Sequence, residues 1–459
     1  MLIAFKVENF RSFGKQVEFS CVATAERAWR ERVFTGPKGL RLLSVAAIYG
    51  SNASGKSNLY RAVEFARNLV VTGVKPEAAI PVQPFRLNER LRESPARFEF
   101  EVLIGEQILN YQFAVTSEAV VEESLAEVHG EKRTALFSRT KLDKIAREWD
   151  LHYLEARAAS KEEKQFISFV AKGTPANQLF LREAQTRNLK QFEKLWKWFQ
   201  HSLILIDPQS TSAGLGFEFA ESQLNDFSTR ILRSVDVGIA RLATEAVALD
   251  SLSLPKDLRG IIENDCKEGQ NVLLHGMEAG RISFSRVKGE LQATKLVSYH
   301  QAGGTSAQVP FDFRDESDGT QRVLDLLPAF YRLANEKSDF VVFVDELDRS
   351  LHSRLTRALI EGYLDGRPSN ARTQFLFTTH DATLLKDKLF RNDEVWLVEK
   401  GETGESEISS LGDFKLRSDK RLVWDYLSGR FGGVPNMNRV ILRHEGEESA
   451  NQPDPAAVP

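Results

Sequence analysis

The residues that most constrain the fold are 50–57, which read Gly-Ser-Asn-Ala-Ser-Gly-Lys-Ser and match the pattern G-x-x-x-x-G-K-S. An apolar run at 45–49 precedes them and a helix-forming stretch at 58–68 follows, so the sequence predicts a buried strand, a tight loop and a helix. Glycines let the backbone curl so that successive N–H groups point at phosphate oxygens, and the helix N-terminus adds its positive dipole end. The pattern therefore predicts a phosphate-binding loop.

Two side chains of this loop add chemistry of their own. Lys56 can reach the β- and γ-phosphates of a nucleotide, and the Ser57 hydroxyl can hold Mg²⁺. We therefore expect ATP and Mg²⁺ as cofactors, with Lys56 among the catalytic residues. The residues expected to contact the nucleotide here are Gly50, Ser51, Asn52, Ala53, Ser54, Gly55, Lys56, Ser57 and Asn58.

Composition narrows the class of protein further. The 459 residues suffice for two or three domains, or for one large domain with an insertion. Lys and Arg total 61 against 64 Asp and Glu, so no global basic excess indicates nucleic acid as a partner. Two cysteines are too few for a disulfide framework and fit a cytoplasmic location. No apolar run reaches about 18 residues and no signal peptide is recognisable, so we expect no membrane contact.

Sequence patterns divide the chain into four expected segments. Residues 1–130 combine the phosphate-binding loop with strand-like runs, those at 98–128 forming an antiparallel sheet. Residues 131–300 are expected to be a mainly helical insertion, because 189–199 and 224–235 have helical spacing, with strands near 203–206 and 281–285. Residues 301–440 again show alternating helix-like and strand-like patterns and are expected to form the second part of the α/β head. The acidic, Pro/Ala-rich residues 441–459 are expected to be a disordered tail.

Two further strands are expected to bring polar groups to the phosphate-binding loop. Residues 339–344 are almost continuously apolar and end in Asp345 and Glu346, as in a buried parallel strand. Ligands of such sheets bind beyond the carboxyl ends of the strands, so Asp345 is the expected Mg²⁺ partner, together with Ser57. Glu346 is the candidate to polarise the attacking water, and His380, after the apolar run 373–379, is a candidate to contact the water or the γ-phosphate.

A second anion-binding helix end is expected near residue 317. Ser317 or Asp318 would cap a helix whose apolar face includes Val323, Leu326 and Phe330. Because one chain rarely needs two phosphate sites, we infer a two-fold dimer in which this helix end covers the nucleotide of the partner. Ser317, Asp318, Gly319 and Thr320 are therefore expected nucleotide contacts.

Together these motifs resemble the ABC-type ATPase heads of the SMC/RecF-like kind. The resemblance rests on residues 7–13 (VENFRSF), the loop 50–57, the signature-like 317–321 (SDGTQ), Asp345-Glu346 and His380. It implies an α/β head, with a P-loop core and an antiparallel β subdomain, that closes around ATP as a dimer. The signature reads SDGTQ in place of LSGGQ, and His352 stands where many heads carry an aspartate. The sequence identifies no Q-loop glutamine, for which Gln83 is no more than a candidate.

A closer resemblance is to the prokaryotic AAA-type ATPases of the RloA/AbiL abortive-infection kind. It is carried by 47–57, 316–320, 345–352 (DELDRSLH) and 426–435 (YLSGRFGGVP). This resemblance implies a homodimer or higher homo-oligomer and a nucleotide-gated switch in antiphage defence that works with an effector protein from a neighbouring gene.

Two other functions stay open at the level of sequence. One is a DNA-repair ATPase, for which the basic residues of 182–197 would have to form a nucleic-acid surface and not an ordinary solvated helix face. The other is a scaffold that hydrolyses ATP slowly and sequesters a partner protein while ATP holds the dimer together.

Overall fold

The computed structural model describes residues 1–141, 147–208, 222–235, 237–252, 254–268, 271–277, 280–303, 305–335, 339–368, 370–414 and 422–430. The expected tail at 441–459 and residues 431–435 of the late motif lie outside these ranges. No helix among the described residues combines the length and the apolarity needed to cross a bilayer.

The first large sheet has seven strands in the order β10-β9-β8-β7-β6-β1-β2, and every neighbouring pair is antiparallel. Its solvent face is polar and its other face is aromatic, because successive side chains of a strand point to opposite sides. Its strands are β1 (Leu2–Glu8), β2 (Val17–Ser20), β6 (Ala96–Ile104), β7 (Gln107–Val115), β8 (Val120–His129), β9 (Lys132–Lys141) and β10 (Arg147–Asp150).

The second sheet has six strands in the order β11-β17-β18-β5-β19-β20, and only its last pair is antiparallel. The strands β5 and β17 are buried throughout, as expected of parallel strands covered on both faces. The strands are β5 (Val45–Gly50), β11 (Leu203–Ile206), β17 (Val341–Val344), β18 (Gln374–Thr378), β19 (Val395–Lys400) and β20 (Ser406–Ser410).

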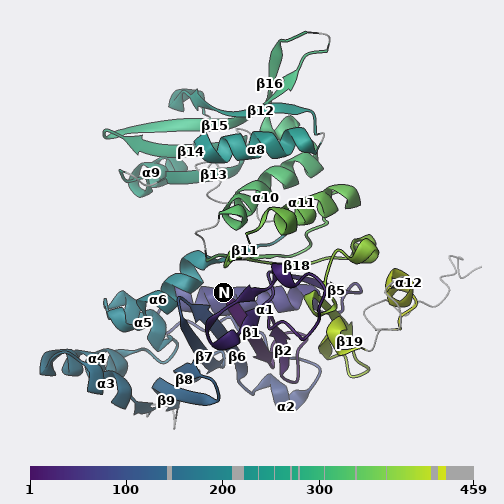
Figure 1. Cartoon of the computed structure of the whole chain (residues 1–459). Coiled ribbons are helices and arrows are strands. Elements are labelled where there is room, and N and C mark those ends of the chain that lie inside the picture. Colours follow the sequence, from purple (N-terminus) through teal and green to yellow (C-terminus); the bar gives the residue numbers. More distant parts are fainter. Residues whose placement is uncertain are drawn as a thin grey trace, which may run out of the picture.

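Alternate residues of the six-stranded sheet belong to two different cores. Ala46 and Ile48 of β5 pack with α1 (Lys56–Val71) and the seven-stranded sheet. Val45 and Ala47 pack with α10 (Asp318–Ala334) and α11 (Ser353–Gly366) on the other side. The layers visible in Figure 1 follow from this alternation, with α10 and α11 lying between the six-stranded sheet and the sheet at the top. The predicted α/β fold class, a mixed sheet carrying the phosphate-binding loop beside an antiparallel sheet, is confirmed.

The middle of the chain is not mainly helical, which corrects the expectation for 131–300. Helices occupy much of 152–202, as α3 (His152–Arg157), α4 (Lys161–Gly173), α5 (Phe180–Thr186) and α6 (Glu193–Lys197), and α8 (Ser222–Ser234) follows. Between residues 239 and 312 the described residues instead form a third, antiparallel sheet and the helix α9 (Lys256–Asp265). The buried apolar positions alternate on β14, at 282 and 284, where a strand was expected. On β12 and β15 they are irregularly spaced, at 239 and 242 and at 293, 296 and 297, so the sequence shows no period of two there.

We call this third sheet the accessory sheet. It has the order β12-β15-β14-β13, with β16 also paired to β15. Its strands are β12 (Ile239–Val247), β13 (Asn271–Met277), β14 (Gly280–Val287), β15 (Glu290–Gln301) and β16 (Gln308–Asp312). It lies above α10 at the top of Figure 1, where α8 is drawn alongside its strands, and β16 leads directly into α10 through a short 3₁₀ turn at Phe313–Asp315.

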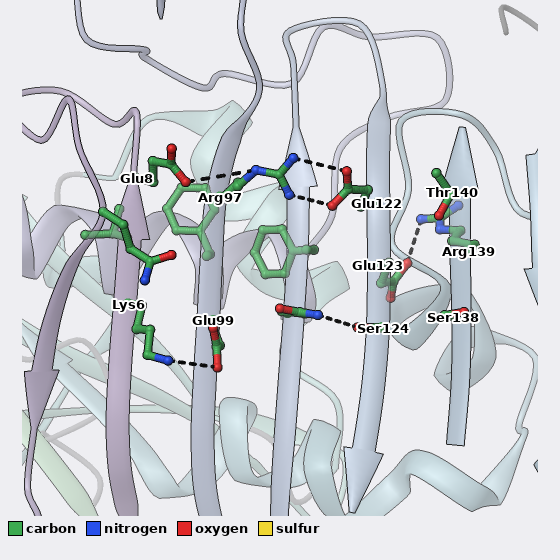
Figure 2. Close-up of a pocket in the computed structure, with 15 residues that line it drawn as sticks. Lys6, Glu8, Arg97, Glu99, Glu122, Glu123, Ser124, Ser138, Arg139 and Thr140 are labelled. Atoms are coloured by element: carbon green, nitrogen blue, oxygen red, sulfur yellow. Dashed lines mark hydrogen bonds and ion pairs between the residues drawn. The ribbon is translucent and has the colours of Figure 1, made fainter. Parts of the chain in front are cut away.

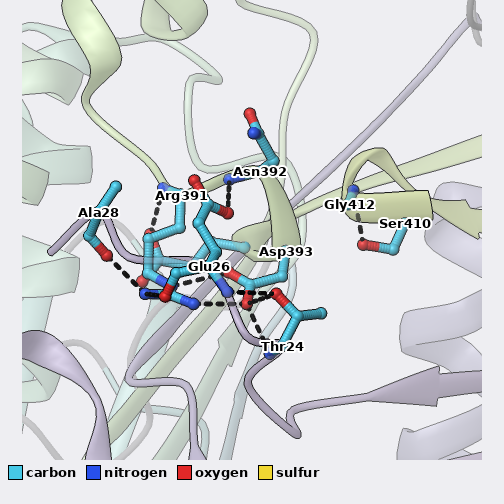
Figure 3. A network of polar contacts seen from close by, with 9 residues as sticks. Thr24, Glu26, Ala28, Arg391, Asn392, Asp393, Ser410 and Gly412 are labelled. Atoms are coloured by element: carbon cyan, nitrogen blue, oxygen red, sulfur yellow. Dashed lines mark hydrogen bonds and ion pairs between the residues drawn. The ribbon is translucent and has the colours of Figure 1, made fainter. Parts of the chain in front are cut away.

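A buried polar network fixes an early loop to the end of the six-stranded sheet. The Arg391 guanidinium, fully buried, forms an ion pair of 2.6 Å with Asp393, which also accepts from the backbone and hydroxyl of Thr24. The backbone N–H of Asn392 donates to Glu26 (Figure 3). Residues 24–28 are thereby joined to a segment more than 360 positions later in the chain.

Candidate functional site

The phosphate-binding loop starts at the end of β5 and ends at the first turn of α1. Gly55 has φ of +115°, and a Cβ there would come within 2.2 Å of the Ser406 hydroxyl on β20. A Cβ at Gly50 would lie 2.4 Å from the Val398 carbonyl oxygen, so both positions require glycine. Ser406 donates to the Ser54 carbonyl, which fixes the loop from outside.

The segment 9–13 contacts this loop beside Ser406, through Ser12. The Asn58 amide donates to the Ser12 hydroxyl at 2.8 Å, and the hydroxyls of Ser12 and Ser406 are also 2.8 Å apart. The sequence analysis missed Ser12 and Ser406 as supports of the loop. Ser12 lies in the VENFRSF stretch at 7–13, which is the signal that could have indicated it, whereas Ser406 lies in no motif recognised in the sequence.

Lys56 is the most buried charged group of the loop, with only 5% of the residue exposed. Its Nζ donates to the carbonyls of Gly50 at 2.7 Å and Ser51 at 3.0 Å, and lies 3.3 Å from His380 Nδ1. Burial lowers the pKa of Lys56 to about 8, and the nearby carboxylates of Asp345, Asp348 and Glu346 oppose the shift. A buried ammonium whose hydrogen-bond partners among the described residues are all neutral acceptors fits an anion such as a nucleotide phosphate.

The carboxylate at the end of β17 lies next to the loop, as predicted. Ser57 Oγ is 3.2 Å from Asp345 Oδ1, and Thr378 at the end of β18 donates to the same oxygen at 2.6 Å. A hydroxyl and a carboxylate side by side are the oxygen ligands that Mg²⁺ takes beside a phosphate. The residues present therefore fit the cation.

Glu346 is held in a backbone conformation that few residues adopt. Its φ is +51°, and its N–H donates to Thr378 Oγ1 at 2.7 Å. Its carboxylate is about one-third exposed and lies 3.9 Å from Arg349, so it is open to solvent and weakly paired. Thr378 thus orients both Asp345 and Glu346, a role that sequence reasoning missed because threonine is common in buried strands.

His380 follows β18 and faces Lys56. Because the ammonium of Lys56 only donates, Nδ1 accepts in this contact and the ring proton is on Nε2. Burial and the Lys56 charge lower the pKa of His380, so the ring is neutral at pH 7. Its backbone N–H donates to Asp348 at 3.2 Å, which fixes the position of the ring after the strand.

The signature-like residues form the predicted helix start. Ser317 is the N-cap of α10, and its hydroxyl accepts from the N–H of Thr320 at 3.2 Å. A Cβ on Gly319 would come within 2.8 Å of the Ser350 carbonyl, so this turn packs on the turn that follows Glu346. Asp318 is exposed to solvent. Among the described residues, no hydrogen bond joins these four residues to the loop at 50–58 of the same chain.

Arg322 is a further residue that the sequence analysis missed. It lies one turn into α10, is 5% exposed and donates to the carbonyls of Asp207 at 3.3 Å and Asp345 at 3.5 Å. Burial lowers its pKa. Through Arg322 the signature helix contacts the peptide group that joins Asp345 to Glu346.

Other candidates from the sequence are not brought into this site. Only the backbone carbonyl of Gln83 is engaged, accepting from Arg11 at 2.7 Å, and its side chain is exposed. In the basic stretch 182–197, Arg187 and Lys197 pair with Glu183 and Glu193 of their own helices. Ion pairs within one helix are typical of a solvent-exposed helix face.

A polar hollow of about 340 Å³ lies on the seven-stranded sheet (Figure 2). No residue of the phosphate-binding loop lines it. Its cations are each paired with a carboxylate, as Lys6–Glu99 at 3.3 Å, Arg97–Glu122 at 2.5 Å and Arg139–Glu123 at 2.7 Å. Because these cations are paired with carboxylates of the same sheet, we do not include the hollow in the candidate site.

A parallel sheet with this loop after one strand, and Asp345 and Glu346 after another, defines a P-loop nucleotide-binding protein. Comparison with protein families matches residues 45–386 to the family described as "AAA domain, putative AbiEii toxin, Type IV TA system". The match covers well over half of the chain, and the chain belongs to this family.

Two comparisons with individual proteins complete this result. The SMC head domain from Thermotoga maritima is similar at 13% sequence identity, over 90% of this chain and 99% of that chain, with a TM-score of 0.36. A crystal structure of the SmcHead bound to the C-winged helix domain of ScpA is similar at 12% identity, over 90% and 99% of the two chains, with a TM-score of 0.38. The comparison with curated proteins found no match.

Proposed function

We propose that the protein binds ATP with Mg²⁺ and hydrolyses it to ADP and phosphate. The observation that carries the proposal is the buried Lys56 ammonium, whose hydrogen-bond partners among the described residues are the carbonyls of Gly50 and Ser51 and the neutral ring of His380. Bound triphosphate would supply an anionic partner. Membership in an AAA family supports the same conclusion.

Each residue at the site then has a role in hydrolysis. Lys56 binds the β- and γ-phosphates, and the N–H groups of residues 50–58 surround the phosphate oxygens. Ser57 and Asp345 would hold Mg²⁺, which would supply positive charge beside the phosphates when bound. Glu346, whose carboxylate is open to solvent, orients the attacking water. His380, whose Nδ1 accepts from Lys56, donates a hydrogen bond from its Nε2–H to the γ-phosphate.

The site is completed by a second copy of the chain. Ser317, Asp318, Gly319 and Thr320 present a helix N-terminus, and they form no hydrogen bond to the loop of their own chain among the described residues. In a two-fold dimer they would contact the nucleotide of the partner, so ATP would hold the dimer closed and hydrolysis would reopen it. Turnover without a trigger would then be slow, because assembly is needed to complete the site.

At the level of the cell, we propose a nucleotide-gated switch in antiphage defence of the RloA/AbiL abortive-infection kind. It would act in the cytoplasm as a homodimer or a higher homo-oligomer, with an effector protein encoded by a neighbouring gene. The ATPase head would comprise 1–130 and 301–440, and 131–300 would be its insertion. The family description, which names a toxin of a toxin–antitoxin system, supports this setting.

The test combines an assay of the purified protein with one in cells. We expect Mg²⁺-dependent phosphate release from the wild type that Lys56→Ala and Glu346→Gln abolish. Only Glu346→Gln should retain ATP binding, because its phosphate contacts are intact. In cells carrying the gene and its neighbour, phage should plate less efficiently than on cells carrying either variant. Hydrolysis without protection would leave the ATPase proposal standing and refute the defence role.

A further inference from the structure

Glu316, directly before the N-cap of α10, is a buried acid that the proposed ATPase mechanism does not use. It is 9% exposed, and its Oε1 lies 2.6 Å from His300 Nε2. Ser298 donates to the same oxygen. Because a carboxylate only accepts, His300 donates through Nε2 in this contact.

The backbone of Glu316 is fixed as well as its side chain. Its carbonyl accepts from the Gln321 amide at 2.9 Å, and its N–H lies 3.4 Å from the Phe313 carbonyl. Glu316 is therefore held on one side by the accessory sheet and on the other by the first turn of α10. The next residue is Ser317, so a displacement of Glu316 is passed on through a single peptide bond.

Both donors to this carboxylate come from β15. Ser298 and His300 are two positions apart on this strand and so point to the same face. β15 is the central strand of the accessory sheet, paired with β12, β14 and β16. The His300 ring is further confined by Phe311, with ring centroids 4.7 Å apart. The accessory sheet thus presents two fixed donors to the residue that precedes the signature.

The consequences of this contact extend beyond the helix start. Gly319 packs so closely on Ser350 that a Cβ would approach its carbonyl to 2.8 Å. Ser350 belongs to the turn that follows Glu346 and also has a positive φ, of 61°. The position of Glu316 therefore affects, through residues 317–319, the turn at Ser350 that follows Glu346, the residue proposed to orient the attacking water.

We propose that Glu316, Ser298 and His300 are positioning residues, through which the accessory sheet sets the placement of the signature residues 317–320. The inference rests on the proposed function, in which these residues complete the ATP site of a partner chain. It makes the accessory sheet part of the ATPase machinery. Any protein that shifts β15 on binding would alter hydrolysis without touching the nucleotide.

The test uses the full-length protein and separates positioning from folding. Glu316→Gln removes the charge with little change of shape, and His300→Ala removes one donor. His300→Gln keeps a donor of similar reach. Tyr299→Phe is the matched control, because it removes a polar contact of the neighbouring β15 residue, with Glu245, that does not involve Glu316.

We expect Glu316→Gln and His300→Ala to lower the rate of ATP hydrolysis, and the tendency to assemble with ATP, by about tenfold. Their affinity for Mg-ATP should stay within about twofold of the wild type, because the phosphate-binding loop is unchanged. The double variant should be no worse than either single one, since both act through one contact. His300→Gln should recover part of the rate, and Tyr299→Phe should behave as the wild type.

Two results would overturn the inference. The first is hydrolysis by Glu316→Gln and His300→Ala at the rate of Tyr299→Phe, with the wild type active, which would leave the proposed function intact. The second is an equal loss of ATP binding and thermal stability in both variants, which would mean that the contact supports the fold in general. A wild type that neither binds nor hydrolyses Mg-ATP would refute the proposed function, and this inference with it.

Discussion

Lys56→Met should make the nucleotide-free protein more stable while it abolishes nucleotide binding. Burial lowers the pKa of Lys56 from 10.5 to about 8, so at pH 7 the folded chain carries a charge that its surroundings disfavour. At 1.36 kcal/mol per pKa unit, this shift corresponds to about 3 kcal/mol of destabilisation. Methionine also loses the hydrogen bonds to Gly50 and Ser51, worth about 1 kcal/mol each. The expected net gain in the free energy of unfolding is therefore about 1 kcal/mol.

The direction of the pKa shift fixes how this gain depends on pH. The pKa of Lys56 is lower in the folded than in the unfolded state, so the unfolded chain binds more protons between pH 8 and 10.5. The stability of the wild type contributed by this group therefore rises with pH in that window. The penalty is fully present below pH 8, so the advantage of Lys56→Met is largest at neutral pH and is lost as the pH approaches 10.5.

The assay is thermal unfolding of nucleotide-free protein in EDTA, at pH 7 and pH 9.5, with ATP binding measured on the same samples. A gain of about 1 kcal/mol would raise the unfolding temperature by about 1 °C in a chain of this size. Lys15→Met is the control, because the side chain of Lys15 is 81% exposed and should change little. A Lys56→Met protein less stable than the wild type at pH 7, or an advantage that does not shrink by pH 9.5, would refute the reasoning.

Three further changes test other parts of the site and the fold. Asp345→Ala should leave ATP binding without metal intact but remove its enhancement by Mg²⁺, measured by titration with and without the cation; an unchanged Mg²⁺ effect would contradict the assignment. Gly319→Ala should weaken ATP-driven assembly by about tenfold or more while each chain still binds ATP, since its Cβ would collide with the Ser350 carbonyl. Burial raises the pKa of Glu394 to about 8, so the folded chain binds the extra proton and its stability falls from pH 4.5 to 8. Glu394→Gln should flatten that fall in unfolding experiments, and a curve parallel to the wild type would count against it.

Sequence could predict those parts of the site whose residues lie close together along the chain. The strand, the loop and the helix within 45–68 are contiguous in the sequence, so local patterns predict all three and their order. Asp345 likewise follows its buried strand directly. Ser317 was recognised as a helix cap from the apolar face that follows it. These features depend on residues within a few positions of one another.

The rest depends on contacts between distant segments. Thr378 bonds to Asp345 across adjacent strands, Arg322 reaches it from a helix, and Ser406 meets the loop from more than 350 residues away. None of these residue types is unusual at its position, so no local pattern distinguishes them. Of the accessory sheet, only a strand near 281–285 was expected from the sequence, because the pairing of its strands joins separate segments of the chain and is not a local pattern.

The most direct test of the central claim is the mass in solution of Glu346→Gln with and without Mg-ATP, beside Lys56→Ala. ATP should bind to Glu346→Gln without being hydrolysed, so its assembly state should rise with ATP, while Lys56→Ala should not respond. A mass that is the same in every condition would contradict the claim that ATP builds the interface between two copies of the chain.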